Sequence, residues 1–138
     1  MDWITDEVAI GNCLEARDAE LLRRHGFKAV VSLDGTVNAK DAETLGLSAV
    51  ASYRFIDGAG NDARLFRLAV DDLRRFAQSH PPVLVQCHAG RSRSAVVVAA
   101  YLMSVRRLDA DAAVAAVRAK RSTNIAPELI EMLARYEA

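Results

Sequence analysis

The chain has 138 residues, which is enough for one domain with a substantial core and too short for two. Hydrophobic residues make up 51% and charged residues 26%, a composition that excludes a disordered chain. Eighteen basic and eighteen acidic residues cancel, so net charge favours neither a nucleic acid nor an anionic membrane as partner. Any attraction for anions must therefore be local.

The two cysteines, Cys13 and Cys87, lie far apart in the chain and do not form the framework of a secreted disulfide protein. No apolar run reaches the roughly 18 residues of a membrane span, and the N-terminus lacks the pattern of a signal peptide. We therefore expect a cytoplasmic protein with no membrane span. Residues 1–138 are predicted to form a single domain, with a monomer favoured.

The first half of the chain alternates short strands and short helices. Strands are predicted at residues 8–10, 28–33 and 52–56, and helices at 18–25 and 38–45. Asp18 is a suitable N-cap for the first of these helices, and Gly46 a suitable C-cap for the second. The run Asp-Gly-Ala-Gly-Asn at 57–61 then predicts a loop.

The second half is richer in helices. Asp62 can cap a helix that His80-Pro81-Pro82 ends, and a strand is predicted at 83–85. Further helices are predicted at 95–103, at 109–120 with Asp109 as cap, and from Pro127 onward. This alternation indicates an α/β fold in which helices flank both faces of a mostly parallel central sheet. Ligands of such folds bind at the carboxyl ends of the strands.

The stretch from Gln86 to Ser94, Gln-Cys-His-Ala-Gly-Arg-Ser-Arg-Ser, joins the strand at 83–85 to an apolar helix. A loop that turns from a strand into a helix start presents backbone N–H groups and the positive end of the helix dipole to an anion. We predict that this loop binds phosphate, and that the same positive field favours the thiolate form of Cys87. The predicted phosphate-binding residues are His88, Ala89, Gly90, Arg91, Ser92 and Arg93, the last through a planar guanidinium that grips two oxygens.

These residues predict a metal-free mechanism for a phosphate monoester. Cys87 attacks phosphorus, and an acid must protonate the leaving oxygen. Asp57, in the glycine-bearing loop that follows a predicted strand, is the candidate acid, and adjacent strand ends would bring it to Cys87. The ionised Asp57 can then act as base for the water that hydrolyses the cysteinyl-phosphate, while Ser94 donates to the departing sulfur. The three histidines have no metal-ligand spacing, so no cofactor is expected.

The chain resembles a small, atypical dual-specificity protein phosphatase of the cysteine-based tyrosine phosphatase superfamily. It has the superfamily's cysteine, five residues and an arginine followed by serine, and Ala89-Gly90 and Ser92-Arg93-Ser94 match the dual-specificity subset. The likeness extends to residues 4–12, 26–33 and 121–133. It implies Cys87 as nucleophile, Arg93 as phosphate ligand, Asp57 as general acid and Ser94 as an assisting residue. Gln86 departs from the family's usual histidine, which implies a less activated cysteine.

Each of these residues also has a plainer interpretation. Arg93 can be a surface ion-pair residue, Ser94 the N-cap of the helix, and Asp57 a turn residue with Asp62 as the rival acid. His88 and Arg91 either shape substrate choice or are simply solvated. Asn124 is either a turn residue or a site residue. Cys13 is expected to be structural, with a redox pairing to Cys87 as the alternative.

Rival functions differ in the loop and its position. A rhodanese-type sulfurtransferase has a loop one residue shorter, an arsenate reductase or low-molecular-weight phosphatase carries its loop at the N-terminus, and a Walker-type loop needs a Gly-Lys pair that is absent here. A non-catalytic phosphate-binding module is the strongest rival because of Gln86. The expected substrates are phosphotyrosine and also phosphoserine or phosphothreonine in proteins. Phosphoinositides, nucleotides and other small phosphates are the alternatives.

Overall fold

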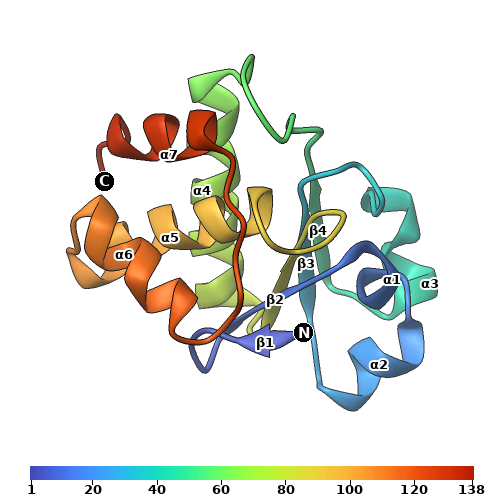
Figure 1. Cartoon of the computed structure of the whole chain (residues 1–138). Helices are drawn as coiled ribbons and strands as arrows, with labels where there is room; N and C mark the ends of the chain where they lie inside the picture. The colour runs from blue at the N-terminus through green and yellow to red at the C-terminus, as the bar shows by residue number, and fades with distance from the viewer.

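The computed structural model describes all 138 residues and has a five-stranded sheet at its centre (Figure 1). The strands follow the order β1-β2-β5-β3-β4, and every pairing is parallel except that of β1 with β2. The α/β fold with a mostly parallel sheet is thus confirmed. The strands are β1 Asp2–Trp3, β2 Val8–Gly11, β3 Ala29–Ser32, β4 Ala49–Ser52 and β5 Val83–Gln86.

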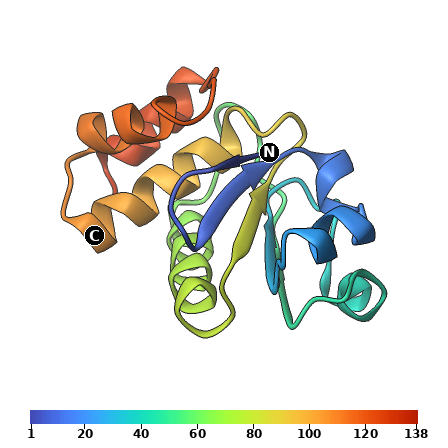
Figure 2. The same cartoon turned by 90° about the horizontal axis from the view of Figure 1, so that it is seen from below.

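Helices cover both faces of the sheet, as Figure 2 shows from below. Helices α4 to α7 lie over one face, where 29 buried residues form the larger core cluster. Helices α1 to α3 lie over the other face above a smaller cluster of nine. The helices are α1 Cys13–Ala16, α2 Ala19–Arg24, the 3-10 turn η1 Ala39–Asp41, α3 Ala42–Leu45, α4 Ala63–Ser79, α5 Arg93–Arg106, α6 Ala110–Arg118 and α7 Pro127–Ala134.

The predicted helix boundaries rest on caps that the structure contains. Asp18, Asp62 and Asp109 each accept a hydrogen bond from a backbone N–H in the first turn of α2, α4 and α6. Gly46 closes α3 in the left-handed conformation, at φ 71°, and Pro127 occupies the first turn of α7. Local chemistry therefore sets where these helices begin and end.

The predicted strand at 52–56 is wrong, because β4 occupies Ala49–Ser52. Beyond it the chain crosses the end of β3: the Tyr53 N–H donates to the Ser32 carbonyl at 2.7 Å, and the Phe55 N–H to the Leu33 carbonyl at 2.9 Å. The alternating pattern around Phe55 arises because its ring packs on Phe66 of α4 and not because it continues the edge strand. The edge strand itself is half exposed and lacks the bulky residues of a strong strand signal.

Two short elements were not expected from the sequence. β1 has two residues, and α1 has four residues held by a capping box between Asn12 and Glu15. Neither is long enough to produce a hydrophobic period.

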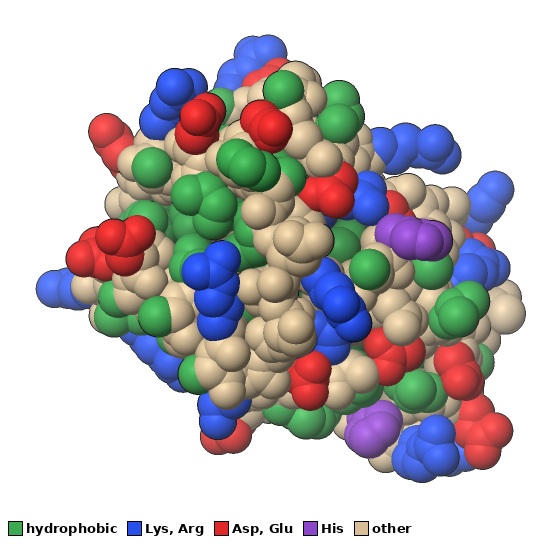
Figure 3. All heavy atoms as spheres, in the orientation of Figure 1, with side chains coloured by type: hydrophobic (Ala, Val, Ile, Leu, Met, Phe, Trp, Pro, Cys, Tyr) green, Lys and Arg blue, Asp and Glu red, His purple; other side chains and the backbone are tan.

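Acidic and basic side chains are interspersed over the face shown in Figure 3, with apolar side chains between them. This agrees with the net charge of zero. Among the helices of the structure, none combines the length and the apolar character needed to cross a membrane.

Candidate active site

The loop between β5 and α5 presents a row of free backbone donors. The structure pairs none of the backbone N–H groups of residues 88–93 with a protein acceptor. This run leads into the first turn of α5, a helix of 14 residues, where the dipole favours negative charge. Consecutive unpaired amides at a helix start form a binding site for an oxyanion such as phosphate.

Cys87 lies at the beginning of this loop and is 2% exposed. Its Sγ is 3.2 Å from the Ser94 hydroxyl oxygen and 3.5 Å from the Ser94 backbone nitrogen. Both groups can donate to a thiolate, so two donors at the start of α5 point at the sulfur. Ser94 is not the N-cap, because α5 begins one residue earlier and Ser92 occupies the cap position without a side-chain cap bond.

One nitrogen of the Arg93 guanidinium is hydrogen-bonded to the protein, and another has no partner. Nη1 donates to the carbonyl of Phe55 at 3.0 Å, whereas Nε is buried with no partner. Arg93 takes part in none of the ion pairs of the structure, so it is not a surface ion-pair residue. An orphaned buried donor beside the six free amides fits a ligand that accepts hydrogen bonds.

Asp57 reaches the loop from the segment that crosses β3. Its Oδ1 accepts a hydrogen bond of 2.5 Å from the Ser92 hydroxyl, and the Ser92 oxygen in turn accepts one of 3.0 Å from the Ala126 N–H. The expectation that adjacent strands bring Asp57 to Cys87 is wrong, since β3 lies between β4 and β5. The crossing segment spans that gap instead, and the bond from Arg93 to Phe55 ties it to the stretch from Gln86 to Ser94, which is predicted to bind phosphate and is called the phosphate loop below.

Asn61 and Asp62 hold the Asp57 loop in shape. The Asn61 amide donates to the carbonyls of Ile56 and Gly58 and accepts from the Ile56 N–H. Asp62 caps α4, and hydrogen bonds from Arg64 lower the pKa of its carboxyl. A carboxylate that stays ionised is a poor proton donor, so Asp62 fits the cap and Asp57 remains the better candidate acid.

Gln86 is completely buried directly before Cys87. Its Nε2 donates to the Cys87 carbonyl at 3.1 Å, and its Oε1 has no partner. Nearby, burial raises the pKa of Asp34 but hydrogen bonds from Thr36, Gln86 and Ser32 outweigh this effect and hold it below its usual value. Gln86 therefore supplies a neutral hydrogen bond to the cysteine backbone next to an ionised carboxylate.

The outer side of the loop carries exposed His88 and Arg91. The Nδ1 of His88 lies 3.5 Å from the Sγ of Cys13, a half-buried free thiol, and the Cys13 N–H donates to the His88 carbonyl at 3.0 Å. The Asn124 N–H supports Arg91 by donating to its carbonyl at 2.9 Å. Cys13 thus packs against the loop. Asn124 contacts the loop through its backbone.

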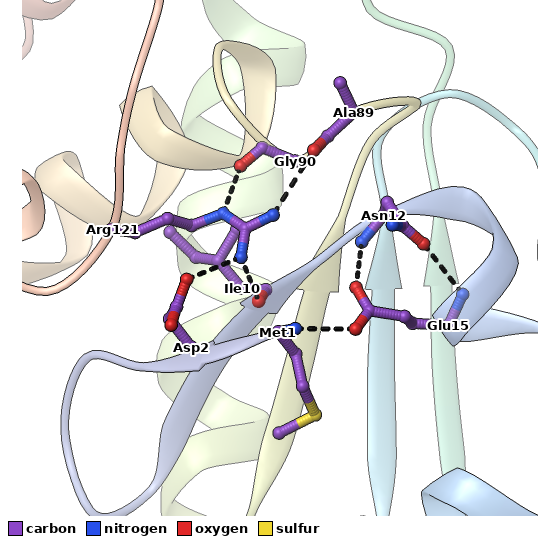
Figure 4. A network of polar contacts seen from close by, with 8 residues as sticks. All are labelled: Met1, Asp2, Ile10, Asn12, Glu15, Ala89, Gly90 and Arg121. Atoms are coloured by element: carbon purple, nitrogen blue, oxygen red, sulfur yellow. Dashed lines mark hydrogen bonds and ion pairs between the residues drawn. The ribbon is translucent and has the colours of Figure 1, made fainter.

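Arg121 is a site residue that sequence reasoning missed. Figure 4 shows its guanidinium beneath the phosphate loop, where Nε donates to the Gly90 carbonyl at 2.6 Å and Nη2 to the Ala89 carbonyl at 3.2 Å. Nη1 bonds Asp2 at 2.8 Å. In the sequence Arg121 follows Lys120 at the expected end of a helix, where basic residues are common, so no local signal sets it apart.

A buried cysteine at the end of a parallel strand, six free amides, an arginine at the helix start and a carboxylate from a neighbouring loop define the class of cysteine-based phosphatases. Within this class the chain belongs to the dual specificity phosphatases: the family model "Dual specificity phosphatase, catalytic domain" matches residues 8–138. The resemblance inferred from the loop is confirmed.

Curated relatives agree with this assignment. Mouse "Dual specificity protein phosphatase 22" is 32% identical over 126 residues, which cover 88% of this chain and 65% of the relative. "Dual specificity protein phosphatase PHS1" of Arabidopsis thaliana is 31% identical over 107 residues, or 76% of this chain and 12% of the relative. The chain thus matches only a small part of some of its relatives.

Solved structures share the fold. A mouse protein assigned as a dual specificity phosphatase and complexed with zinc tungstate has a TM-score of 0.85 at 26% identity, covering 99% of this chain and 85% of that one. Tk-PTP in its active form has a TM-score of 0.77 at 25% identity, covering 95% and 91%. Human DUSP28, at 24% identity, has a TM-score of 0.83 over 96% of this chain and 92% of its own.

Proposed function

We propose that residues 1–138 act as one catalytic domain that hydrolyses phosphate monoesters through a cysteinyl-phosphate, with phosphotyrosine in proteins as the main substrate and phosphoserine and phosphothreonine as further ones. The observation that carries this proposal is the free donor set around Cys87: six unpaired amides and the orphaned Nε of Arg93. These donors match the three non-bridging oxygens of a phosphoryl group. The tungstate complex of the mouse structural relative supports the proposal, since tungstate is also a tetrahedral oxyanion.

In the first step the Cys87 thiolate attacks phosphorus and the bond from phosphorus to the ester oxygen breaks. The amides of residues 88–93 and Arg93 neutralise the charge that spreads over the equatorial oxygens. Protonated Asp57 transfers its proton to the departing alkoxide or phenoxide. Its bond to Ser92 holds the carboxyl at the edge of the phosphate loop.

In the second step a water molecule attacks phosphorus and the bond from phosphorus to sulfur breaks. The Asp57 carboxylate takes a proton from the water and regenerates the acid. Sulfur leaves as a thiolate, which the Ser94 hydroxyl, 3.2 Å away, can stabilise by donating a hydrogen bond. The products are inorganic phosphate and the free enzyme.

The rival proposal is a non-catalytic phosphate-binding module. Binding alone needs the amides and Arg93, but it needs neither the thiol at their focus nor the carboxyl held by Ser92. The bond from Gln86 to the Cys87 carbonyl further supports catalysis, since it leaves a donor where the family usually has histidine. Catalysis also requires a reduced Cys87, which favours a reducing compartment such as the cytoplasm.

The deciding experiment is metal-free turnover of p-nitrophenyl phosphate, with vanadate as inhibitor. Native protein should turn over, and Cys87→Ser should lose ~10³-fold or more of the rate while remaining folded. Turnover that survives Cys87→Ser would reject Cys87 as the nucleophile. Vanadate binding without turnover at any pH would favour the binding module. Comparing phosphopeptides with phosphoinositides and nucleotides then separates protein substrates from small phosphates.

A further inference from the structure

Arg121 is the only side chain that fixes the outer surface of the phosphate loop through two successive carbonyls. It donates to the Ala89 carbonyl at 3.2 Å and to the Gly90 carbonyl at 2.6 Å, and its third nitrogen contacts Asp2 and the Ile10 carbonyl (Figure 4). The guanidinium therefore joins β1 and β2 to the loop. The Arg121 side chain is 11% exposed and so is largely withdrawn from solvent.

The two carbonyls belong to peptide groups whose other end faces the proposed phosphate site. The Ala89 carbonyl shares a peptide plane with the Gly90 N–H, and the Gly90 carbonyl with the Arg91 N–H. Both N–H groups are among the unpaired donors of the loop. A cation bonded to a carbonyl oxygen draws electron density from the peptide group and strengthens its N–H as a donor. It also holds that N–H in a fixed direction.

Gly90 shows how closely the loop is packed at this point. Its φ is +69°, and a Cβ built on it would lie 2.5 Å from the Gly11 carbonyl oxygen and 2.7 Å from Nη2 of Arg121. The backbone of the loop is thus seated directly on β2 and on the guanidinium. Only glycine allows this approach, since both the sign of φ and the missing side chain are required.

We propose that Arg121 is a positioning residue: it orients and polarises the Gly90 and Arg91 amides, and so sets the affinity of the loop for oxyanions without contacting the substrate. The inference rests on the proposed function of the loop. It adds a residue from the segment after α6 to a site otherwise built from β5, α5 and the Asp57 loop.

The test measures oxyanion affinity and thiolate reactivity directly. Vanadate inhibition constants and the protection of Cys87 from iodoacetate by inorganic phosphate are compared for native protein, Arg121→Met, Arg121→Lys and the control Arg24→Met. Arg24 is exposed on α2 and makes no side-chain hydrogen bond. We expect Arg121→Met to weaken vanadate binding about tenfold, from the loss of charged hydrogen bonds. Arg121→Lys should recover part of this affinity, because one ammonium restores the charge but not the two-carbonyl fork.

The outcomes separate the two proposals. Native protein that neither turns over nor binds vanadate would reject the proposed function itself. Native protein that does both, with folded Arg121→Met or Arg121→Lys binding vanadate equally well, would overturn the role of Arg121. A lowered melting temperature with unchanged vanadate affinity would likewise make Arg121 merely structural. If Arg121→Met does not fold, Arg121→Lys decides by the same comparison, with an affinity loss of threefold or more expected.

Discussion

At Gln86 this chain has an amide where its family usually has histidine. A histidine can supply both a hydrogen bond and a positive charge, and the amide supplies only the hydrogen bond. The neutral hydrogen bond to the Cys87 carbonyl is present, but the positive charge is not. The orphaned Oε1 and the ionised Asp34 beside Gln86 mark a place where a second donor and a positive charge would be stabilised. The side chain contacts the backbone of Cys87, and a positive charge near a thiol favours its thiolate form.

We therefore expect Gln86→His to increase the thiolate fraction of Cys87 at mildly acidic pH. The rate of iodoacetate alkylation at pH 5.5 should rise severalfold, and the acidic limb of the rate profile should move to lower pH. Gln86→Leu, which removes the donor, should shift both in the opposite direction. Identical alkylation profiles for native protein and Gln86→His would show that this position does not tune the thiolate.

Matched substitutions at Asp57 and Asp62 test which of the two is the general acid. Asp57→Asn should lower the rate for poor leaving groups such as alkyl phosphates by about 10²-fold, and affect p-nitrophenyl phosphate much less, because only poor leaving groups need the proton. Asp62→Asn keeps the N-cap of α4 and should leave both rates near native. The assignment fails if the leaving-group dependence follows Asp62→Asn instead.

At the scale of elements, the sequence predicts where helices begin and end from their caps. It does not predict which segments cross one another in space. Asp18, Asp62, Asp109, Gly46 and Pro127 mark helix ends because each acts on its own backbone within one turn. The phosphate loop was equally readable, since its cysteine, glycine, arginine and helix start are consecutive.

The parts that sequence reasoning missed depend on contacts between distant segments. The strand predicted at 52–56 begins three residues after the start of β4 because Phe55 packs on α4. Asp57 reaches the site over β3 instead of from an adjacent strand. The sequence predicts that Ser92 lines the phosphate site, but not that its hydroxyl donates to Asp57 and accepts from the Ala126 N–H. Arg121 carries no local signal, since its partners lie 31 and 119 positions away.

The turn after β3 provides a pH-dependent contribution to stability. Asp34 accepts from the Thr36 N–H at 2.9 Å and from the Ser32 hydroxyl at 3.3 Å, and hydrogen bonds hold its pKa below 3.8 despite burial. A depressed carboxyl pKa stabilises the fold at pH values above 3.8, and this contribution is lost as the pH falls through the lower folded-state pKa. Asp34→Asn should therefore lower the urea midpoint at pH 7, and the gap to native protein should narrow below pH 3.8. A gap independent of pH would contradict this origin.

At the scale of the whole molecule, the two core clusters share the strands between them. In β5, Val83 and Val85 face the larger cluster while Leu84 faces the smaller one. In β3, Val31 faces the larger cluster and Val30 the smaller one. Neither helical layer can separate from the sheet without exposing the strands on which the other layer packs, so the chain should unfold in one cooperative transition.

The single tryptophan allows this cooperativity to be measured from the smaller side. Trp3 stacks on Phe27 at 5.1 Å, and Phe27 belongs to the smaller cluster, whereas far-UV circular dichroism is dominated by α4 to α7. Urea curves from the two probes, and from loss of vanadate-sensitive turnover, should coincide. Leu102→Ala in the larger cluster and Leu22→Ala in the smaller should each cost about 2–5 kcal/mol. Each substitution should lower the urea midpoints from both probes by the same amount. A Leu22→Ala variant in which only the midpoint from Trp3 fluorescence shifts would show that the layer of α1 to α3 unfolds independently.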